Sequence, residues 1–208
     1  MTEFPQTDTV ALADAVRALI DAIRLADAPI DALTRARFAV ESATSELLPY
    51  RHLGQVAQAA LDGSIFSERS ELYGPPSEFF PYSPIVGPRN PIAPPVQMWP
   101  DDALHLHGSV TLEAPYNGPP GLVHGGVIAL IFDELLGACA VINHCAGFTG
   151  TLTVKYLRGT PIRTPITMEA WVERVEGRKT FVAGELRYGG GPTAAATGVF
   201  ISAAAPLP

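Results

Sequence analysis

The stretch GPPGLVHGGVIALIFDELLGACAVI, residues 118–142, constrains the fold more than any other part of the chain. From Gly125 to Ile142 it has the length of a helix, and apolar residues occur all round the helical wheel. A helix that is apolar on every side is a buried helix. We therefore predict a long central helix, wrapped by a sheet on one side and covered by another segment on the other.

Two adjacent carboxylates interrupt this helix, and burying a carboxylate without a partner is expensive. Asp133 shares its helical face with small residues alone, namely Gly126, Ala129, Gly137 and Ala140. Small residues let a second backbone or a slender ligand come close, which favours Asp133 as the functional carboxylate. Glu134 lies on another stripe, where we expect it to reach a rim and meet an arginine. The alternative for Asp133 is a structural hydrogen bond to a neighbouring strand end.

The start of the helix, VHGGV, places Gly125 and Gly126 in the first turn. Glycine there costs about 1 kcal/mol of helix stability relative to alanine. In return, a ligand oxygen can approach backbone N–H groups that have no intrahelical partner and that the helix dipole makes partly positive. This pattern is typical of a site for an anion or an oxyanion.

The spacing along the helix predicts a shared site. His124 and Asp133 are nine residues apart, which corresponds to roughly 13–14 Å along a helix axis. Within one chain, the helix start and Asp133 cannot both reach the same carbonyl carbon. Two chains can supply them if the helix start of one faces Asp133 of the other. We therefore expect a symmetric homodimer with two composite sites, and a dimer of dimers stays open.

The sequence predicts strands in the regions around the helix. Residues 103–114 alternate between apolar and polar, and strand-like runs follow at 148–158, 165–176, 179–188 and 193–203. One strand, one long helix and four strands are typical of an α+β domain with a mostly antiparallel sheet packed on a single helix. We assign residues 101–208 to this domain.

A proline-rich segment, residues 63–100, precedes the domain. It has nine prolines between Pro75 and Pro100, together with many large apolar residues. Such a stretch cannot form a regular helix or a central strand. A solvated linker would not need so many apolar groups, so we expect an ordered, extended segment that packs on the sheet.

The N-terminal residues, 1–62, are predicted to form a helical hairpin extension. Residues 9–48 show helical spacing in two blocks, separated by the short sequence ADAP. Asp8 or Thr9 is the expected cap of the first helix and Asp27 that of the second. Pro29 suits a first turn and Pro49 ends the second helix. A packing role is favoured over a functional one.

Composition and charge exclude several classes of function. The net charge is −7, with −8 in residues 1–117 and +1 in residues 118–208, which argues against a nucleic-acid partner. No signal peptide is expected from the first residues, and no apolar stretch is expected to reach the length of a membrane span. Cys139 and Cys145 lack a zinc spacing and are predicted to be free core thiols of a cytoplasmic protein.

A metal site is not expected. His105 and His107 share one face of the predicted strand. Two histidines are too few to hold a metal without acidic or thiol ligands at a suitable spacing. We predict no metal and no cofactor.

Three segments together resemble a known family: residues 118–137, the run TGTLTVKYLRGTPI and the run AWVERVEGRKTFVAGEL. They are similar to the hotdog-fold acyl-CoA thioesterases of the phenylacetate-pathway (PaaI-like) type, and especially to thioesterase superfamily members with GPPG-x-VHGG before the helix. The resemblance covers about residues 90–203. It implies a hotdog fold, in which a five- to six-stranded antiparallel sheet wraps a long helix, and a homodimer that hydrolyses acyl-CoA in fatty acid metabolism.

The resemblance also implies roles for individual residues. Asp133 matches the catalytic carboxylate, as general base or as nucleophile. Gly126, with Gly125 beside it, matches the backbone that polarises the thioester carbonyl. His124 matches the histidine that holds the helix start, and Thr149 the threonine that helps to position water.

Two further residues are candidates for binding the substrate, Asn117 and Arg158. Asn117 lies one residue further from the glycines than the asparagine of some relatives. Two rival functions stay open at this point: a non-catalytic regulator that binds acyl-CoA, and an acyl-CoA hydratase or dehydratase. The hydratases of this fold keep an Asp and a His close together at the helix start, whereas His144 is eleven residues from Asp133.

Overall fold

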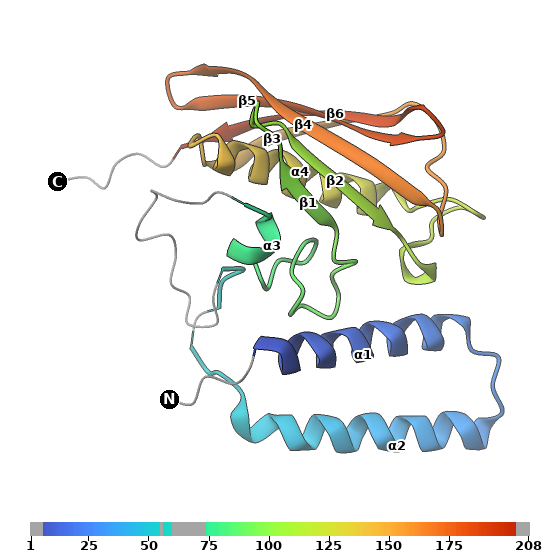
Figure 1. Ribbon diagram of the computed structural model, residues 1–208. Helices are drawn as coiled ribbons and strands as arrows, with labels where there is room; N and C mark the ends of the chain where they lie inside the picture. Colours follow the sequence, from blue (N-terminus) through green and yellow to red (C-terminus); the bar gives the residue numbers. More distant parts are fainter. Residues whose placement is uncertain (1–5, 55, 60–73, 203–208) are drawn as a thin grey trace.

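A computed structural model describes residues 6–54, 56–59 and 74–202 of the chain (Figure 1). Six antiparallel strands form one sheet in the order β1-β2-β4-β5-β6-β3, and a single long helix, α4, lies against one face of it. The predicted α+β class, with a sheet wrapped on a central helix, is confirmed.

The strands agree closely with the sequence pattern. They are β2 (Leu106–Thr111), β3 (Phe148–Tyr156), β4 (Pro165–Glu176), β5 (Lys179–Tyr188) and β6 (Gly191–Ile201). Gly177 in the β4–β5 turn has a φ of 59°, a left-handed conformation that glycine adopts without strain. The last residue of the predicted strand 193–203 lies outside the described residues.

The central helix α4 (Gly125–Ile142) forms the middle of the core. Its fully buried side chains include Phe132, Leu135 and Leu136, which flank the two carboxylates in sequence. By length and composition alone, α4 could cross a membrane, contrary to the expectation that no apolar stretch would be long enough. Half of it is buried inside this one chain, as a core helix requires.

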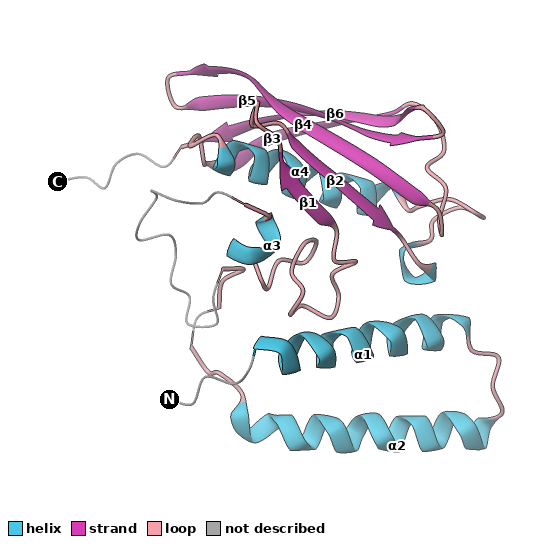
Figure 2. Cartoon of the chain, in the orientation of Figure 1, coloured by secondary structure: helices cyan, strands magenta, loops and turns pink. Residues whose placement is uncertain are grey.

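A segment that we call the strap, residues 80–96, covers the core from the side away from the sheet. It follows the short helix α3 (Pro76–Phe79) and leads into β1 (Gln97–Pro100) as loop (Figure 2). Its buried side chains are Phe80, Ser83, Ile85, Val86, Ala93 and Val96. Residues 63–73, the first part of the predicted proline-rich segment, lie outside the described residues.

Strand β1 was not expected. It pairs with β2 at the edge of the sheet, from Gln97 opposite Ser109 to Pro100 opposite Leu106. The prolines exclude a central strand, but an edge strand tolerates proline because one side of its backbone needs no partner.

The helices α1 (Gln6–Leu25) and α2 (Ile30–Leu47) form the predicted N-terminal hairpin, with α1 next to the rest of the molecule (Figure 1). The predicted caps were wrong. Helix α1 begins before Asp8 and Thr9, and the N-cap of α2 is Pro29, with no side-chain hydrogen bond, rather than Asp27. Helix α2 has no buried residue, and a 3-10 turn, Leu48–Tyr50, follows it.

Candidate functional site

Asp133 receives a hydrogen bond from the strand next to its helix. The Thr149 hydroxyl, near the start of β3, donates to Asp133 Oδ1 over 2.8 Å. The Asp133 side chain is half-buried, and Thr149 is exposed. The structure therefore brings together two of the residues predicted from the sequence, and leaves the carboxylate open to a substrate.

The first turn of α4 forms a second group. His124 is the N-cap, and its Nδ1 accepts a hydrogen bond of 3.0 Å from the Gly126 N–H. The Tyr156 hydroxyl donates to the Gly125 carbonyl over 2.9 Å. Among the described residues, the Gly125 N–H makes no hydrogen bond. The open donor of the helix start is thus Gly125, whereas the family resemblance favoured Gly126.

The two groups lie at opposite ends of β3. Thr149 stands near its beginning and Tyr156 at its end, and Gly125 and Asp133 are separated by roughly 12 Å of helix. Among the described strands, β3 pairs only with β6, at the edge of the sheet, and most of its residues are exposed. One chain therefore carries two half-sites, both beside an open strand edge.

Glu134 has a different partner from the one predicted. The Ser83 hydroxyl of the strap donates to Glu134 Oε1 over 2.8 Å, in place of the expected arginine. Burial raises the pKa of the Glu134 carboxyl, the Ser83 hydrogen bond lowers it, and the neighbouring Asp133 raises it further. The second carboxylate of the helix is therefore a contact of the strap.

The two candidate substrate-binding residues bond to backbone carbonyls of the chain. The Asn117 side-chain amide donates to the Gly118 and Pro119 carbonyls in the loop before α4. The Arg158 guanidinium donates to carbonyls around the β5–β6 turn, those of Tyr188, Gly191 and Pro192. Arg158 lies two residues after Tyr156, the last residue of β3, and therefore belongs to the end of that strand where Tyr156 meets the helix start.

Comparisons with known proteins agree with this fold. Residues 120–195, from just before α4 into β6, match the thioesterase superfamily. A crystal structure of a thioesterase superfamily protein aligns with 97% of this chain and 94% of its own, with a TM-score of 0.81 and 29% identity. The sheet and its helix are thus similar to this superfamily, and we call them the thioesterase domain.

Curated relatives match the chain over stretches of similar length. Acyl-coenzyme A thioesterase THEM4 of Xenopus laevis is 43% identical over 75 residues, which is 35% of this chain and 33% of the relative. MIOREX complex component 3 of Saccharomyces cerevisiae is 31% identical over 86 residues, or 38% of this chain and 32% of the relative. The chain thus spans about a third of the length of the curated relatives it matches.

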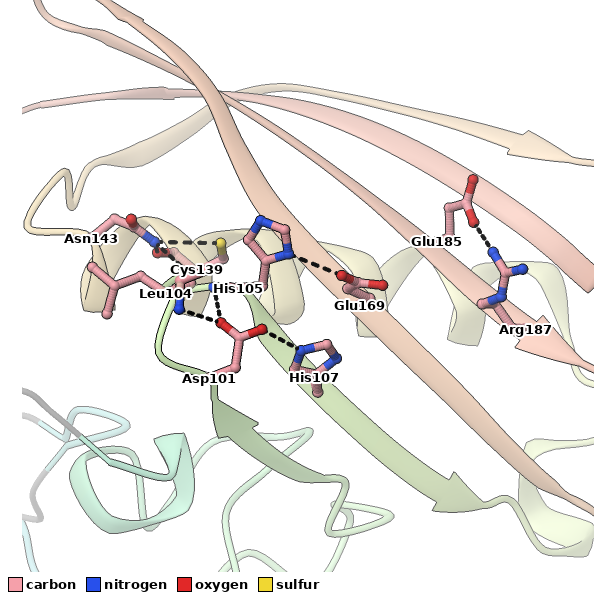
Figure 3. Close-up of polar contacts among 10 residues, drawn as sticks. Asp101, Leu104, His105, His107, Cys139, Asn143, Glu169, Glu185 and Arg187 are labelled. Atoms are coloured by element: carbon pink, nitrogen blue, oxygen red, sulfur yellow. Dashed lines mark hydrogen bonds and ion pairs between the residues drawn. The ribbon is translucent and has the colours of Figure 1, made fainter.

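His105 and His107, the two histidines of the predicted strand 103–114, lie on the outer surface of the sheet (Figure 3). His105 bonds to Glu169 over 3.0 Å, and His107 bonds to Asp101 over 2.9 Å, which lowers the Asp101 pKa. Each imidazole thus faces a different carboxylate. In the described part of the chain, no group of three or more His, Cys, Asp or Glu side chains is placed to hold a metal ion.

Sequence reasoning missed two residues of the thioesterase domain and its strap. Tyr156 contacts the helix start from the end of β3, and Ser83 holds Glu134. The period of β3 could have shown that Tyr156 lies on the strand that carries Thr149. No local pattern marks Ser83, because it meets Glu134 across 51 residues of chain.

Proposed function

We propose that this protein hydrolyses an acyl-CoA thioester to the free acid and CoA. The observation that carries the proposal is the hydrogen bond between Thr149 and Asp133, on a helix whose first turn presents the open Gly125 N–H. Such an amide suits a developing oxyanion, and a half-buried carboxylate suits a base or nucleophile. The name of the matching relatives, acyl-coenzyme A thioesterase, supports the same substrate class.

In the proposed reaction, the thioester carbonyl oxygen accepts a hydrogen bond from the Gly125 N–H. His124 holds the helix start, because its side chain accepts a hydrogen bond from the Gly126 N–H. Asp133 takes a proton from water while the water oxygen attacks the carbonyl carbon, or Asp133 attacks first and water then cleaves the anhydride. The Thr149 hydroxyl orients the carboxylate. The C–S bond breaks, and the CoA thiolate leaves and takes a proton from solvent.

We further propose that two chains share each site. Antiparallel pairing of two β3 edges would bring Thr149 and Asp133 of one chain beside Tyr156 and Gly125 of the other. The open edge supports this arrangement, because an unpaired strand is a ready template for a second strand. The proposed assembly is a homodimer with two composite sites, and a dimer of dimers stays a prediction.

Thiol release from acyl-CoAs of two to eighteen carbons, and from one aryl-CoA, tests the activity. Asp133→Asn should lower kcat a hundredfold or more, the range for a positioned base. Asp101→Asn is the matched control, because that carboxylate contacts His107 on the outer sheet surface. Acyl-CoA binding without thiol release by the wild-type protein would instead support a regulator.

Mixed dimers test the shared site. Asp133→Asn and Gly125→Pro chains should each be inactive alone, since each homodimer lacks one half of both sites. After verified subunit exchange, random mixing should restore up to about a quarter of the wild-type activity, because half of the dimers have one intact site. Exchange without recovery would place the whole site within one chain.

Several finer expectations stay predictions. They are the phenylacetate-pathway (PaaI-like) branch, a role in fatty acid metabolism, a cytoplasmic location, substrate contacts by Asn117 and Arg158, and the absence of a membrane or nucleic-acid partner. The curated relatives point to the THEM4 type for the branch, and their names give no support to a cytoplasmic location.

A further inference from the structure

The Ser83 hydroxyl of the strap takes part in three hydrogen bonds. Its side chain is fully buried. The Ser83 oxygen accepts the backbone N–H groups of Ile85 (3.0 Å) and Val86 (3.2 Å), and its hydroxyl donates to Glu134. Since an N–H can only donate, the single hydroxyl proton of Ser83 is directed at Glu134. The direction of this hydrogen bond is therefore fixed.

The turn that carries Ser83 is itself held tightly. The Gly87 N–H donates to the Ser83 carbonyl over 3.1 Å. A Cβ at Gly87 would lie 2.5 Å from the Ser83 backbone nitrogen and oxygen, so the turn requires glycine there. Arg17 of α1 donates to the carbonyls of Pro88 and Asn90, which follow in the same loop. Ser83 thus projects from a rigid support rather than from a mobile loop.

Glu134 and Asp133 leave the same turn of α4 in different directions. Asp133 meets Thr149 of the edge strand, and Glu134 meets Ser83 of the strap. This turn is therefore fastened from both sides by hydroxyl donors.

We propose that Glu134, held by Ser83, is a positioning residue for Asp133, because it fixes the turn that carries the catalytic carboxylate. The inference rests on the proposed thioesterase function. It makes the strap a part of the catalytic apparatus, although the strap lies outside the region that matches the superfamily.

Four variants separate this role from a purely structural one. Ser83→Ala and Glu134→Ala should lower kcat roughly 3- to 10-fold with KM within twofold, because displacement of a reacting group by 1 Å costs about a hundredfold and a smaller shift costs less. Glu134→Gln should keep most of kcat, because its amide oxygen still accepts from Ser83. Thr180→Val is the matched control for stability. It removes another hydrogen bond from a buried hydroxyl, the one that Thr180 donates to the Cys145 carbonyl.

A second readout needs no activity. Ser83→Ala should shift the NMR resonance of the Thr149 methyl group, because Thr149 donates to Asp133 and a moved turn moves that contact. Thr180→Val should leave this resonance in place. The spectrum therefore decides the inference even if acyl-CoA hydrolysis itself is disproved.

Two results would overturn the proposal. One is a kcat of Ser83→Ala equal to that of Thr180→Val at matched loss of thermal midpoint. The other is a Thr149 methyl resonance that coincides in Ser83→Ala and in the wild type. If Ser83→Ala does not fold, Glu134→Ala still supplies both readouts.

Discussion

The Gly125 N–H can be removed with little disturbance of the helix that carries it. Gly125 is the first residue of α4, a position where proline is favoured because its fixed φ suits the helix and no N–H is needed there. The preceding residue, His124, has φ −64° and ψ 131°, the extended conformation that proline requires before it. Gly125→Pro should therefore keep the capping bond between Gly126 and His124.

The expected magnitude follows from the role of the donor. Loss of one oxyanion donor costs about 10²–10³ in kcat, or about 2.7–4 kcal/mol of transition-state stabilisation. Gly125→Ala is the matched control, because it keeps the N–H. A Cβ at this position would lie 3.5 Å from the Tyr156 ring, an ordinary contact distance. The alanine variant should therefore retain kcat within about threefold, since that contact disturbs nothing.

Thiol release under saturating acyl-CoA measures kcat for both variants, and circular dichroism with a thermal midpoint verifies the fold. We expect a low kcat for proline and a near wild-type kcat for alanine. If a folded Gly125→Pro protein turned over as fast as Gly125→Ala, the Gly125 amide would not be the oxyanion donor, and the reading of the helix start would fail.

Two further predictions concern ionisation. Burial raises the pKa of the Cys139 thiol to about 12. An alkylating reagent at pH 8 should therefore label Cys145 alone in the native protein and both thiols after denaturation, and mass spectrometry counts the labels. Labelling of Cys139 in the native protein would contradict this. Because the pKa of Glu134 is raised in the folded state, the folded protein binds its proton more tightly than the unfolded chain does, and stability should fall as pH rises through that pKa. Glu134→Gln should remove this part of the slope in urea unfolding measured from pH 4.5, the ordinary value, upward, and an unchanged slope would count against the buried carboxyl as its source.

The sheet and the central helix could be predicted because their signals are local. The all-round apolar pattern gives α4 its bounds, and alternation gives β3, β4 and β5 almost to the residue. The contact between Asp133 and Thr149 follows from the same regularity once the helix is known to lie against the sheet. The match to the superfamily covers this same regular part.

The remaining contacts depend on tertiary structure. Nothing in the local sequence joins Ser83 to Glu134, and β1 is hidden by prolines that only an edge position tolerates. The choice between Gly125 and Gly126 depends on the rotamer of His124, whose Nδ1 occupies the Gly126 amide. The sequence also determines helix caps poorly, because α1 starts before the predicted caps Asp8 and Thr9.

The packing of the strap determines where the chain could be cut. Together with β1 it buries five large apolar side chains, Phe80, Ile85, Val86, Val96 and Met98. Burial of each such residue contributes about 1.5–3 kcal/mol. Removal of all five would therefore cost as much as the roughly 5–15 kcal/mol by which a whole domain is stable. A fragment that starts at residue 101 would therefore not be an autonomous folding unit, and a chimera that exchanges the thioesterase domain with a relative must carry residues 76–100 along with it.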